Sequence, residues 1–475
     1  MLGKISLVVL LALYGWVAFS SPGYDDEFFN VNMVENGKTF TDLYTLANSI
    51  NVHPPGQYLI NKALWHLSGN WSIVRITTAV FAASIIWLLW RSVAWSTPLT
   101  GLFAYLAICL NPALLLWCTG IRWYAYFVPL FSLMAMGMLR NPASPFRFWG
   151  PFFLLSMALF MIGYAAVVLI PVAFAIALYV RRERLHDELA VVLGFGLTAL
   201  LLSSHQLIVF VTVHARNSSS QTAGLVQAIT GLGLHVLSNQ GAMPVSPFGM
   251  SLVLANLLLF GVAVNTVRTV RIGPVSGLFV LGALGLAAAQ LTGKFRNLVT
   301  VAAFQGVFQA QLFQTITNKP LMMCTFFLMA VGNIGGTYNV AMHNGTTKGS
   351  WNTPYGEVLS DLQHKRDLLT CSRVQVITHD PVLAYHASGQ GAAVVYVGQD
   401  QWREKIKAFT GCRAAVQTFR GSMSNDLAQQ YARLINELPK RVDTAMFGPD
   451  RYAWFKRKLD PDVPDYYVRV TYFAQ

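Results

Sequence analysis

Residues 73–90 read IVRITTAVFAASIIWLLW, a run of 18 residues in which Arg75 is the only charged side chain. A helix of this length spans about 27 Å, close to the roughly 30 Å hydrocarbon core of a bilayer. Comparable apolar runs recur from Leu7 to Ile334, and the whole chain is 54% hydrophobic and 12% charged, with a mean hydropathy of +0.46. This composition is too apolar for a soluble protein of 475 residues and predicts a polytopic bundle of membrane helices.

We expect about eleven transmembrane helices. They are predicted at residues 5–20, 73–90, 99–117, 123–139, 148–162, 164–180, 190–211, 249–267, 274–291, 298–316 and 320–337. Lys and Arg mark every second connection, most clearly at residues 181–184, so the positive-inside rule puts the N-terminus in the cytoplasm and the C-terminal region outside. The first run also resembles a signal peptide with a cleavage site at Ala18-Phe19-Ser20, but the many later spans favour a retained helix.

Two parts follow from the pattern. Residues 1–337 form the membrane domain, with long outer loops at 21–72 and 212–248, and residues 338–475 form a small soluble domain. Loops of that length tend to be functional. In the second part, strands are predicted at 374–378, 392–397 and 466–473, with helices beginning at 381 and covering 427–438. A small extracytoplasmic α/β domain is the expected result.

The net charge of +13 is unevenly distributed. Residues 1–337 hold 17 basic and 8 acidic side chains, a net charge of +9, whereas residues 338–475 hold 17 and 13, a net charge of +4. The positive-inside bias and the scarcity of acids explain most of the excess, so a phospholipid or lipid-linked phosphate is a better partner than nucleic acid. If the C-terminal region is outside, Cys371 and Cys412 pair in a disulfide; two unrelated thiols remain the alternative.

Acidic residues of the membrane domain gather in the first outer loop. Three of the eight share the arginine-rich segment around residues 181–188, and the other five lie between Asp25 and Asp42. Asp25-Asp26-Glu27 is therefore the place for a general base at the outer membrane face. In an extended segment Asp26 would point away from its two neighbours. The competing interpretation is structural, with Asp25 or Asp26 capping a short helix that runs to Val34.

His53-Pro54-Pro55-Gly56 introduces the next helix, at residues 57–67. Its apolar residues Tyr58, Leu59, Ala63, Leu64 and Leu67 have an amphipathic spacing, which predicts a helix in the plane of the membrane interface with Trp65 and Trp71 at headgroup depth. His53 either contacts substrate or stabilises the loop, and the spacing favours neither.

Cations stand at two outer helix ends. Arg122-Trp123-Tyr124 begins the fourth span, and Lys294-Phe295-Arg296 ends the ninth against the positive-inside bias. Arg122, Lys294 and Arg296 suit a phosphate or pyrophosphate group, while an interfacial snorkelling arginine is the plainer interpretation of Arg122. The chain has no Walker A, HExxH, CxxC or GxSxG motif, so nothing supports ATP hydrolysis, zinc proteolysis or serine hydrolysis.

These segments together resemble the GT-C glycosyltransferases, in particular the protein O-mannosyltransferase and aminoarabinose-transferase branch with its bacterial lipopolysaccharide- and O-antigen-modifying enzymes. The resemblance rests on the Asp-Glu pair after the first helix, His53-Pro54-Pro55, residues 69–75, the Arg122-Trp123-Tyr124 segment and residues 294–298. Residues 348–362 and 378–385 are similar to the soluble domain of many members. The first-loop combination is the most specific of these features.

The resemblance implies an outward-facing site that uses a polyprenyl-phosphate (undecaprenyl-phosphate) sugar donor and a glycan or lipid acceptor. Asp26 matches the family's base and Glu27 its supporting acid; the extra acid Asp25 leaves the choice of base open. Arg122, Lys294 and Arg296 would hold the donor phosphate, with His53 and Tyr124 as substrate contacts. Some relatives use a divalent metal such as Mg²⁺ or Mn²⁺, for which this sequence assigns no ligands.

Two other functions compete with glycosyl transfer. A flippase or transporter of lipid-linked saccharides would carry charges at mid-membrane and paired, broken helices, whereas charges here stand at the ends of spans. An O-antigen ligase or polymerase would place its critical outer loop late in the chain, whereas the acids here are in the first loop.

Overall fold

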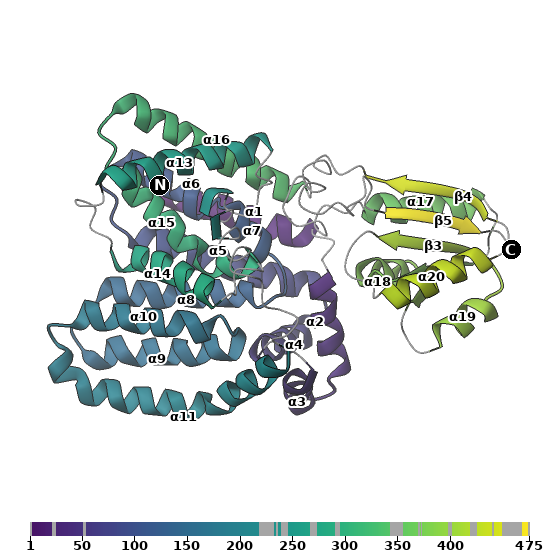
Figure 1. Cartoon of the computed structure of the whole chain (residues 1–475), viewed down its shortest axis with the longest axis horizontal. Helices are drawn as coiled ribbons and strands as arrows, with labels where there is room; N and C mark the ends of the chain where they lie inside the picture. Colours follow the sequence, from purple (N-terminus) through teal and green to yellow (C-terminus); the bar gives the residue numbers. More distant parts are fainter. Residues whose placement is uncertain are drawn as a thin grey trace. The chain divides into compact units, whose positions relative to one another are not determined.

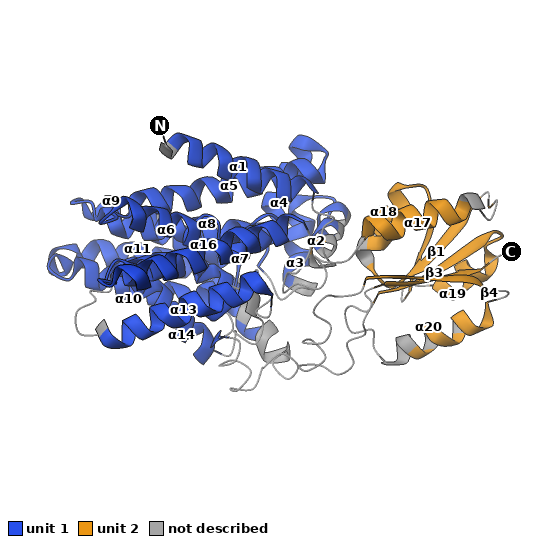
Figure 2. Ribbon diagram, turned by 90° about the horizontal axis from the view of Figure 1, so that it is seen from above, with its two compact units in different colours: residues 1–20, 30–342 blue, residues 21–29, 343–475 orange. Residues whose placement is uncertain are grey.

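The computed structural model describes most of the chain, namely residues 2–20, 25–50, 54–217, 232–233, 236–238, 246–266, 273–289, 295–342, 355–368, 371, 373–397, 401–418, 425–438, 441–448 and 468–473. Two compact units are distinguished (Figure 2). Unit 1 comprises residues 1–20 and 30–342, and unit 2 comprises residues 21–29 and 343–475. The second boundary lies five residues beyond the predicted junction at 337/338, and the start of the first outer loop groups with unit 2.

The first part of the chain is helical (Figure 1). Its elements are α1 (Leu2–Ser20), α2 (Asp25–Asn36), α3 (Phe40–Ile50), α4 (Gly56–Ser68), α5 (Trp71–Ser92), α6 (Pro98–Ile108), α7 (Pro112–Cys118), α8 (Tyr124–Arg140), α9 (Pro145–Ile162), α10 (Ala166–Arg181), α11 (Leu185–Asn217), α13 (Pro247–Thr266), α14 (Pro274–Ala288), the 3₁₀ helix η3 (Phe295–Val301), α15 (Ala302–Phe313) and α16 (Lys319–Ala341). Helix is found at each of the predicted spans.

Five of the described helices are long and apolar enough to cross a membrane, and six spans result if α6 and α7 count as one; four further apolar helices are shorter. The predicted span 99–117 corresponds to α6 and α7, which are bent by 41° at a short break. Pro112 causes the break, since it has no N–H to donate to the preceding turn. Asn111 instead caps α7, and its Oδ1 accepts from the backbone of Ala113 at 2.9 Å.

Helices α9, α10 and α11 meet at a buried ion pair. α9 packs against α8, α10 and α11 (Figure 1). Arg181, at the end of α10, pairs with Glu188 in the first turn of α11, and the indole of Trp149 on α9 donates to the same carboxylate at 2.8 Å. Asn141 accepts from Arg181 at 2.8 Å. Two charged residues of the 181–188 segment, Arg181 and Glu188, are thus explained by packing, because a buried charge requires a partner.

Unit 2 is a three-layer α/β/α sandwich. Its elements are α17 (Tyr355–Leu368), β1 (Val374–Thr378), α18 (Pro381–Gly389), β2 (Ala393–Tyr396), α19 (Trp402–Ala408), β3 (Cys412–Thr418), α20 (Asn425–Glu437), β4 (Arg441–Phe447) and β5 (Val468–Phe473). The strand order is β2-β1-β3-β5-β4, with β1, β2 and β3 parallel and β5 antiparallel to both β3 and β4.

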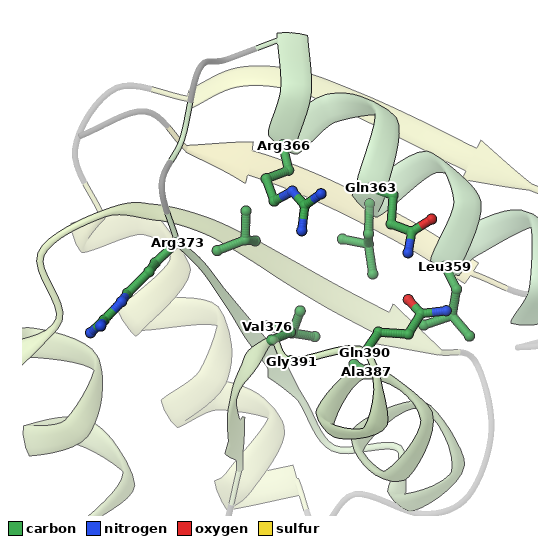
Figure 3. Close-up of a pocket in the computed structure, with 11 residues that line it drawn as sticks. Leu359, Gln363, Arg366, Arg373, Val376, Ala387, Gln390 and Gly391 are labelled. Carbon is green, nitrogen blue, oxygen red and sulfur yellow. The ribbon is translucent and has the colours of Figure 1, made fainter.

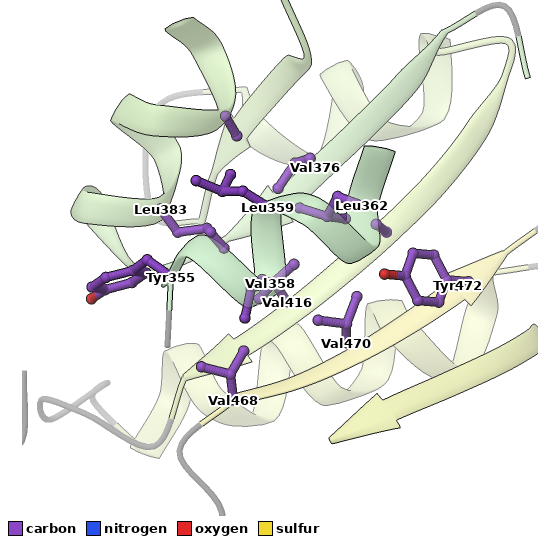
Figure 4. Close-up of a cluster of buried hydrophobic side chains, with 12 residues drawn as sticks. Tyr355, Val358, Leu359, Leu362, Val376, Leu383, Val416, Val468, Val470 and Tyr472 are labelled. Carbon is purple, nitrogen blue, oxygen red and sulfur yellow. The ribbon is translucent and has the colours of Figure 1, made fainter. Parts of the chain in front are cut away.

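Both faces of this sheet are covered. Figure 4 shows residues of α17 and α18, among them Leu359 and Leu383, packed on Val416 and Val470. The opposite face carries α19 and α20, whose Trp402 and Tyr431 pack with neighbouring strand residues such as Ile377 and Ala415. Adjacent strand residues enter different cores because side chains alternate across a strand.

The predicted strands at 374–378, 392–397 and 466–473 and the helices at 381 and 427–438 are confirmed, within a few residues at the ends. The strands β3 and β4 and the helices α17 and α19 were not predicted. A disulfide joins Cys371 to Cys412, the first residue of β3.

Candidate functional site

The first outer loop is folded into three helices. α2 begins at Asp25 and runs to Asn36, so the three consecutive acids occupy its first turn, and the segment is a short helix, as the competing interpretation expected, and not extended. Glu27 is fully buried, which is rare for a carboxylate. The side chains of Asp25 and Asp26 lie outside the described part of the chain.

One backbone carbonyl accepts hydrogen bonds from two helices of this loop. The Ile121 oxygen, in the turn before α8, accepts from the Asn30 amide of α2 at 3.0 Å and from the Asn61 amide of α4 at 3.1 Å. The Tyr126 hydroxyl of α8 donates to the Asn61 oxygen. All three side chains are buried. Because buried amides are stable only when paired, these bonds fix α2 and α4 on the turn that carries Arg122 and Tyr124.

The C-terminal end of α2 is fastened by a lysine. Lys62 of α4 is buried, and its ammonium donates to the carbonyls of Val34 (3.2 Å) and Gly37 (2.5 Å). A cation favours this position because the last carbonyls of a helix are unpaired and carry the negative end of its dipole. The indole of Trp71 donates to Glu35 of the same helix at 2.9 Å.

α4 buries polar as well as apolar residues, since Tyr58 is fully buried and Leu59 and Leu64 pack against the same core. Its polar residues Gln57, Asn61 and Lys62 are buried, whereas the apolar Leu67 is 85% exposed. An apolar outer face is what a helix in contact with lipid requires. Trp71 is buried against α2 and stacked on Trp65, and its predicted position at headgroup depth stays a prediction.

Two glycines allow neighbouring segments to meet at the start of α4. A Cβ on Gly56 would lie 2.4 Å from the carbonyl oxygen of Met161, near the end of α9. A Cβ on Gly163, in the turn between α9 and α10, would lie 2.6 Å from the Trp123 ring. The start of α4, the α9–α10 turn and the turn at residues 121–123 therefore form one tightly packed region.

Arg122 and Tyr124 are both part of this region. Arg122 is buried, so the interpretation as a snorkelling surface arginine is wrong. Tyr124 opens α8, and its ring packs against Trp123 (4.0 Å between centroids) and Trp117 (5.2 Å). A second buried arginine, Arg75, lies on α5. Both arginines make contacts with neighbouring groups.

The other predicted site residues are described less fully. His53 and Lys294 lie outside the described residues, and Arg296 is described only as part of the backbone of η3. Most of the second outer loop is also outside. Its residues 236–238 are anchored inside unit 1, where Gln305 donates to the Val236 carbonyl at 3.0 Å and Asn256 donates to the Leu237 carbonyl at 2.9 Å.

Sequence reasoning missed the residues that hold the region together, above all Asn30, Asn61 and Lys62. A usable pattern existed, because positions 57, 61 and 62 form one polar stripe on α4 at helical spacing. No three His, Cys, Asp or Glu side chains within the described ranges are placed to hold a metal ion.

Unit 2 has a separate pocket of about 80 Å³ between α17 and α18. In Figure 3, Gln363 and Arg366 extend from α17 over an apolar floor that includes Val376, and Gln390 lies opposite. Arg373 points away from the opening in the same view. The pocket is small and its rim is solvent-exposed.

The chain shares its fold with a solved structure. The crystal structure of ArnT from Cupriavidus metallidurans bound to undecaprenyl phosphate matches 98% of this chain and 97% of that one, with a TM-score of 0.53 and 11% identity. ArnT in the apo state matches 99% and 97%, with a TM-score of 0.42 and 15% identity. No protein-family model matches the chain, and no curated protein does. The first match shows that the helical bundle followed by a small α/β unit is an ArnT-like fold.

Proposed function

We propose that the chain is an integral-membrane glycosyltransferase of the GT-C type. It would move one sugar from a polyprenyl-phosphate donor to a hydroxyl of an envelope glycan or lipid. The observation that carries this proposal is the match of fold, over nearly the whole chain, with a protein described as bound to undecaprenyl phosphate. Fold alone does not determine activity. The first-loop acids supply the chemical argument that the fold lacks.

In this proposal Asp26 is the general base, with Asp25 as the alternative. The carboxylate of Asp26 takes the proton of the acceptor hydroxyl while the hydroxyl oxygen attacks the anomeric carbon of the donor. The bond between that carbon and the phosphate oxygen breaks, and the polyprenyl phosphate leaves with the bonding electrons. A single displacement of this kind inverts the anomeric centre. Glu27 supports Asp26 or binds the acceptor.

The leaving group gains negative charge on its phosphate, so cations near it should supply much of the rate gain. We assign this role to Arg122, Lys294 and Arg296. Burial of Arg122 supports the assignment, because a guanidinium out of water interacts more strongly with an anion. Tyr124 and His53 are proposed to contact the substrate beside it.

The proposed reaction takes place on the outer face of the cytoplasmic membrane. The disulfide between Cys371 and Cys412 supports an extracytoplasmic unit 2, because disulfides persist mainly in oxidising compartments. The positive-inside distribution of Lys and Arg gives the same orientation. The N-terminus would then lie in the cytoplasm.

Sugar transfer by the purified protein in lipid tests the proposal. A panel of undecaprenyl-phosphate sugars is offered with a crude envelope-glycan acceptor to wild type, Asp25→Asn and Asp26→Asn. We expect donor-dependent transfer that Asp26→Asn lowers by at least about a hundredfold, the usual contribution of a general base. Loss only in Asp25→Asn would move the role by one residue. Full activity of both variants would refute the first-loop mechanism, and movement of lipid-linked sugar without transfer would favour a flippase.

A further inference from the structure

Gln57, in the first turn of α4, is a buried amide with no hydrogen bond to any described residue. Its side chain has no exposed surface, and within the described part of the chain neither its Oε1 nor its Nε2 has a hydrogen-bond partner. Burying an amide in this way destabilises a protein, because the amide loses its hydrogen bonds to water and gains none in return. A residue of this kind calls for an explanation.

Comparison with the other buried glutamines sets Gln57 apart. Gln206, Gln305, Gln309 and Gln375 each donate from Nε2 to a neighbouring oxygen, at 2.6 to 3.3 Å. Gln206, Gln309 and Gln375 leave only the carbonyl oxygen without a partner among the described residues. Among the described buried glutamines, Gln57 is alone in leaving its nitrogen, with two N–H donors, unused as well.

The surroundings of Gln57 are tightly packed, and the hydrogen-bonded group around Asn61, one turn further along α4, includes a second unpaired acceptor. Asn61 lies one turn further along the same face of α4, and both of its amide atoms are paired. Asn30 shares the Ile121 carbonyl with Asn61, but its own Oδ1 is buried without a partner among the described residues. Gly56 is in contact with Met161, which fixes the backbone beside Gln57.

The unused groups indicate the chemistry of a ligand. Two oxygens accept and one NH₂ group donates, and none of them is charged. A phosphate offers only acceptors at neutral pH, so it would leave both oxygens unpaired. A hydroxyl both donates and accepts, and neighbouring hydroxyls on a sugar ring match an amide on both sides.

We propose that Gln57, assisted by the Oδ1 of Asn30, recognises ring hydroxyls of the sugar that is transferred. This inference rests on the proposed function, because it assumes a sugar-bearing lipid substrate. Gln57 follows directly on the segment from His53 to Gly56 at the start of α4, and it is a specificity residue, not part of the proton transfer. Because its side chain is fully buried, the contact forms only when the side chains that cover it move aside.

Replacing Gln57 with methionine tests this role. Methionine keeps the length of the side chain and removes the unpaired amide, so Gln57→Met should unfold at the same temperature as wild type or higher. Gln309→Met is the matched control, because that buried amide is paired with Asn256 at 2.6 Å. It should unfold at a lower temperature and keep its response to sugar. Gln57→Leu serves as a second variant with the same expected behaviour.

Unfolding temperatures are measured with undecaprenyl phosphate alone and with the panel of undecaprenyl-phosphate sugars. At least one sugar-bearing lipid should raise the Tm of wild type and Gln309→Met above the value with the bare lipid. In Gln57→Met this excess should disappear while the effect of the bare lipid remains. In transfer assays kcat/KM should fall about tenfold to a hundredfold, mainly through KM for the donor.

Three results separate the inference from its alternatives. Wild-type transfer and sugar response in Gln57→Met would overturn it and leave Gln57 as an amide that binds only water. A wild type that responds equally to bare and sugar-bearing lipid would also overturn it. If wild type responds to the sugar but transfers none of the panel, the recognition by Gln57 stands and the proposed transferase activity fails.

Discussion

Lys62→Met should loosen the C-terminal end of α2 while leaving its acids in place. The lysine is buried and donates to the carbonyls of Val34 and Gly37. Hydrogen bonds from charged groups contribute about 1.5–3 kcal/mol each, and both carbonyls would remain buried without this donor. Methionine retains most of the apolar stem, so the loss is electrostatic and not a cavity effect. We expect about 3 kcal/mol of lost local stability.

Amide hydrogen exchange measures this effect directly. A loss of about 3 kcal/mol makes exchange through local opening roughly a hundredfold faster, and the change should be confined to residues 30–37. Lys38→Met is the matched control, because Lys38 is in the same loop but is exposed. We expect little change for that variant.

The outcome also concerns function. If α2 positions the base, its loosening should lower kcat more than it alters donor affinity, because a small misplacement of a catalytic group slows the reaction strongly. Exchange in Lys62→Met that matches wild type would show that the two hydrogen bonds do not hold α2, and would refute the reasoning.

Three further predictions concern other parts of the chain. Cys371→Ser should destabilise unit 2 by about 4 kcal/mol, because it opens a loop with a sequence separation of 41, and limited proteolysis should show faster cleavage there. Lys365→Met should make unit 2 less sensitive to acid. The hydrogen bond from Lys365 lowers the pKa of Asp443 below its ordinary value. The pair therefore stabilises unit 2 above the pKa of the unfolded state, and this stabilisation is lost as the pH falls below about 4. Gly163→Ala should destabilise unit 1 by about 1–3 kcal/mol through collision with Trp123, measured as a lower Tm.

Each of these has a direct check. Unchanged proteolysis of Cys371→Ser would show that the disulfide adds nothing to unit 2. An acid transition of the same midpoint in wild type and Lys365→Met would contradict the role of the Asp443 pair. Gly194→Ala is the control for Gly163→Ala, because nothing lies within 4 Å of the added methyl group; equal Tm values for the two variants would refute the packing argument.

The helical bundle was predictable because its information is local. Each membrane helix corresponds to an apolar run longer than about 15 residues, and such a run can be recognised without knowledge of its tertiary contacts. The bend at Asn111-Pro112 was readable too, but it lies inside one continuous apolar run. In unit 2, β3 was missed because its sequence, CRAAVQT, has two alanines and few β-branched residues, so burial in the sheet, not propensity, makes it a strand.

The amphipathic pattern of α4 was recognised, but the rule that assigns its faces depends on the solvent. In water the apolar face of a helix is buried. Beside lipid, polar residues are buried against the rest of the protein instead, as Gln57, Asn61 and Lys62 are. No local pattern relates residue 30 to residue 61 or either one to the carbonyl of Ile121, since that contact joins positions up to 91 residues apart. The sequence therefore located the acids of the candidate site but not the amides that orient their helix.

The distribution of paired and unpaired polar groups in the first loop gives those amides different tasks. Asn61 satisfies the Ile121 carbonyl before α8, and Lys62 satisfies the carbonyls at the C-terminal end of α2. Gln57, one turn earlier on the same helix, is held by the same packing but has no such task. This packing orders the Gln57 side chain before a ligand arrives, so only the side chains that cover it have to move for the proposed contact to form. Substitutions at 61 and 62 should therefore be detected first in stability, and those at 57 first in substrate preference.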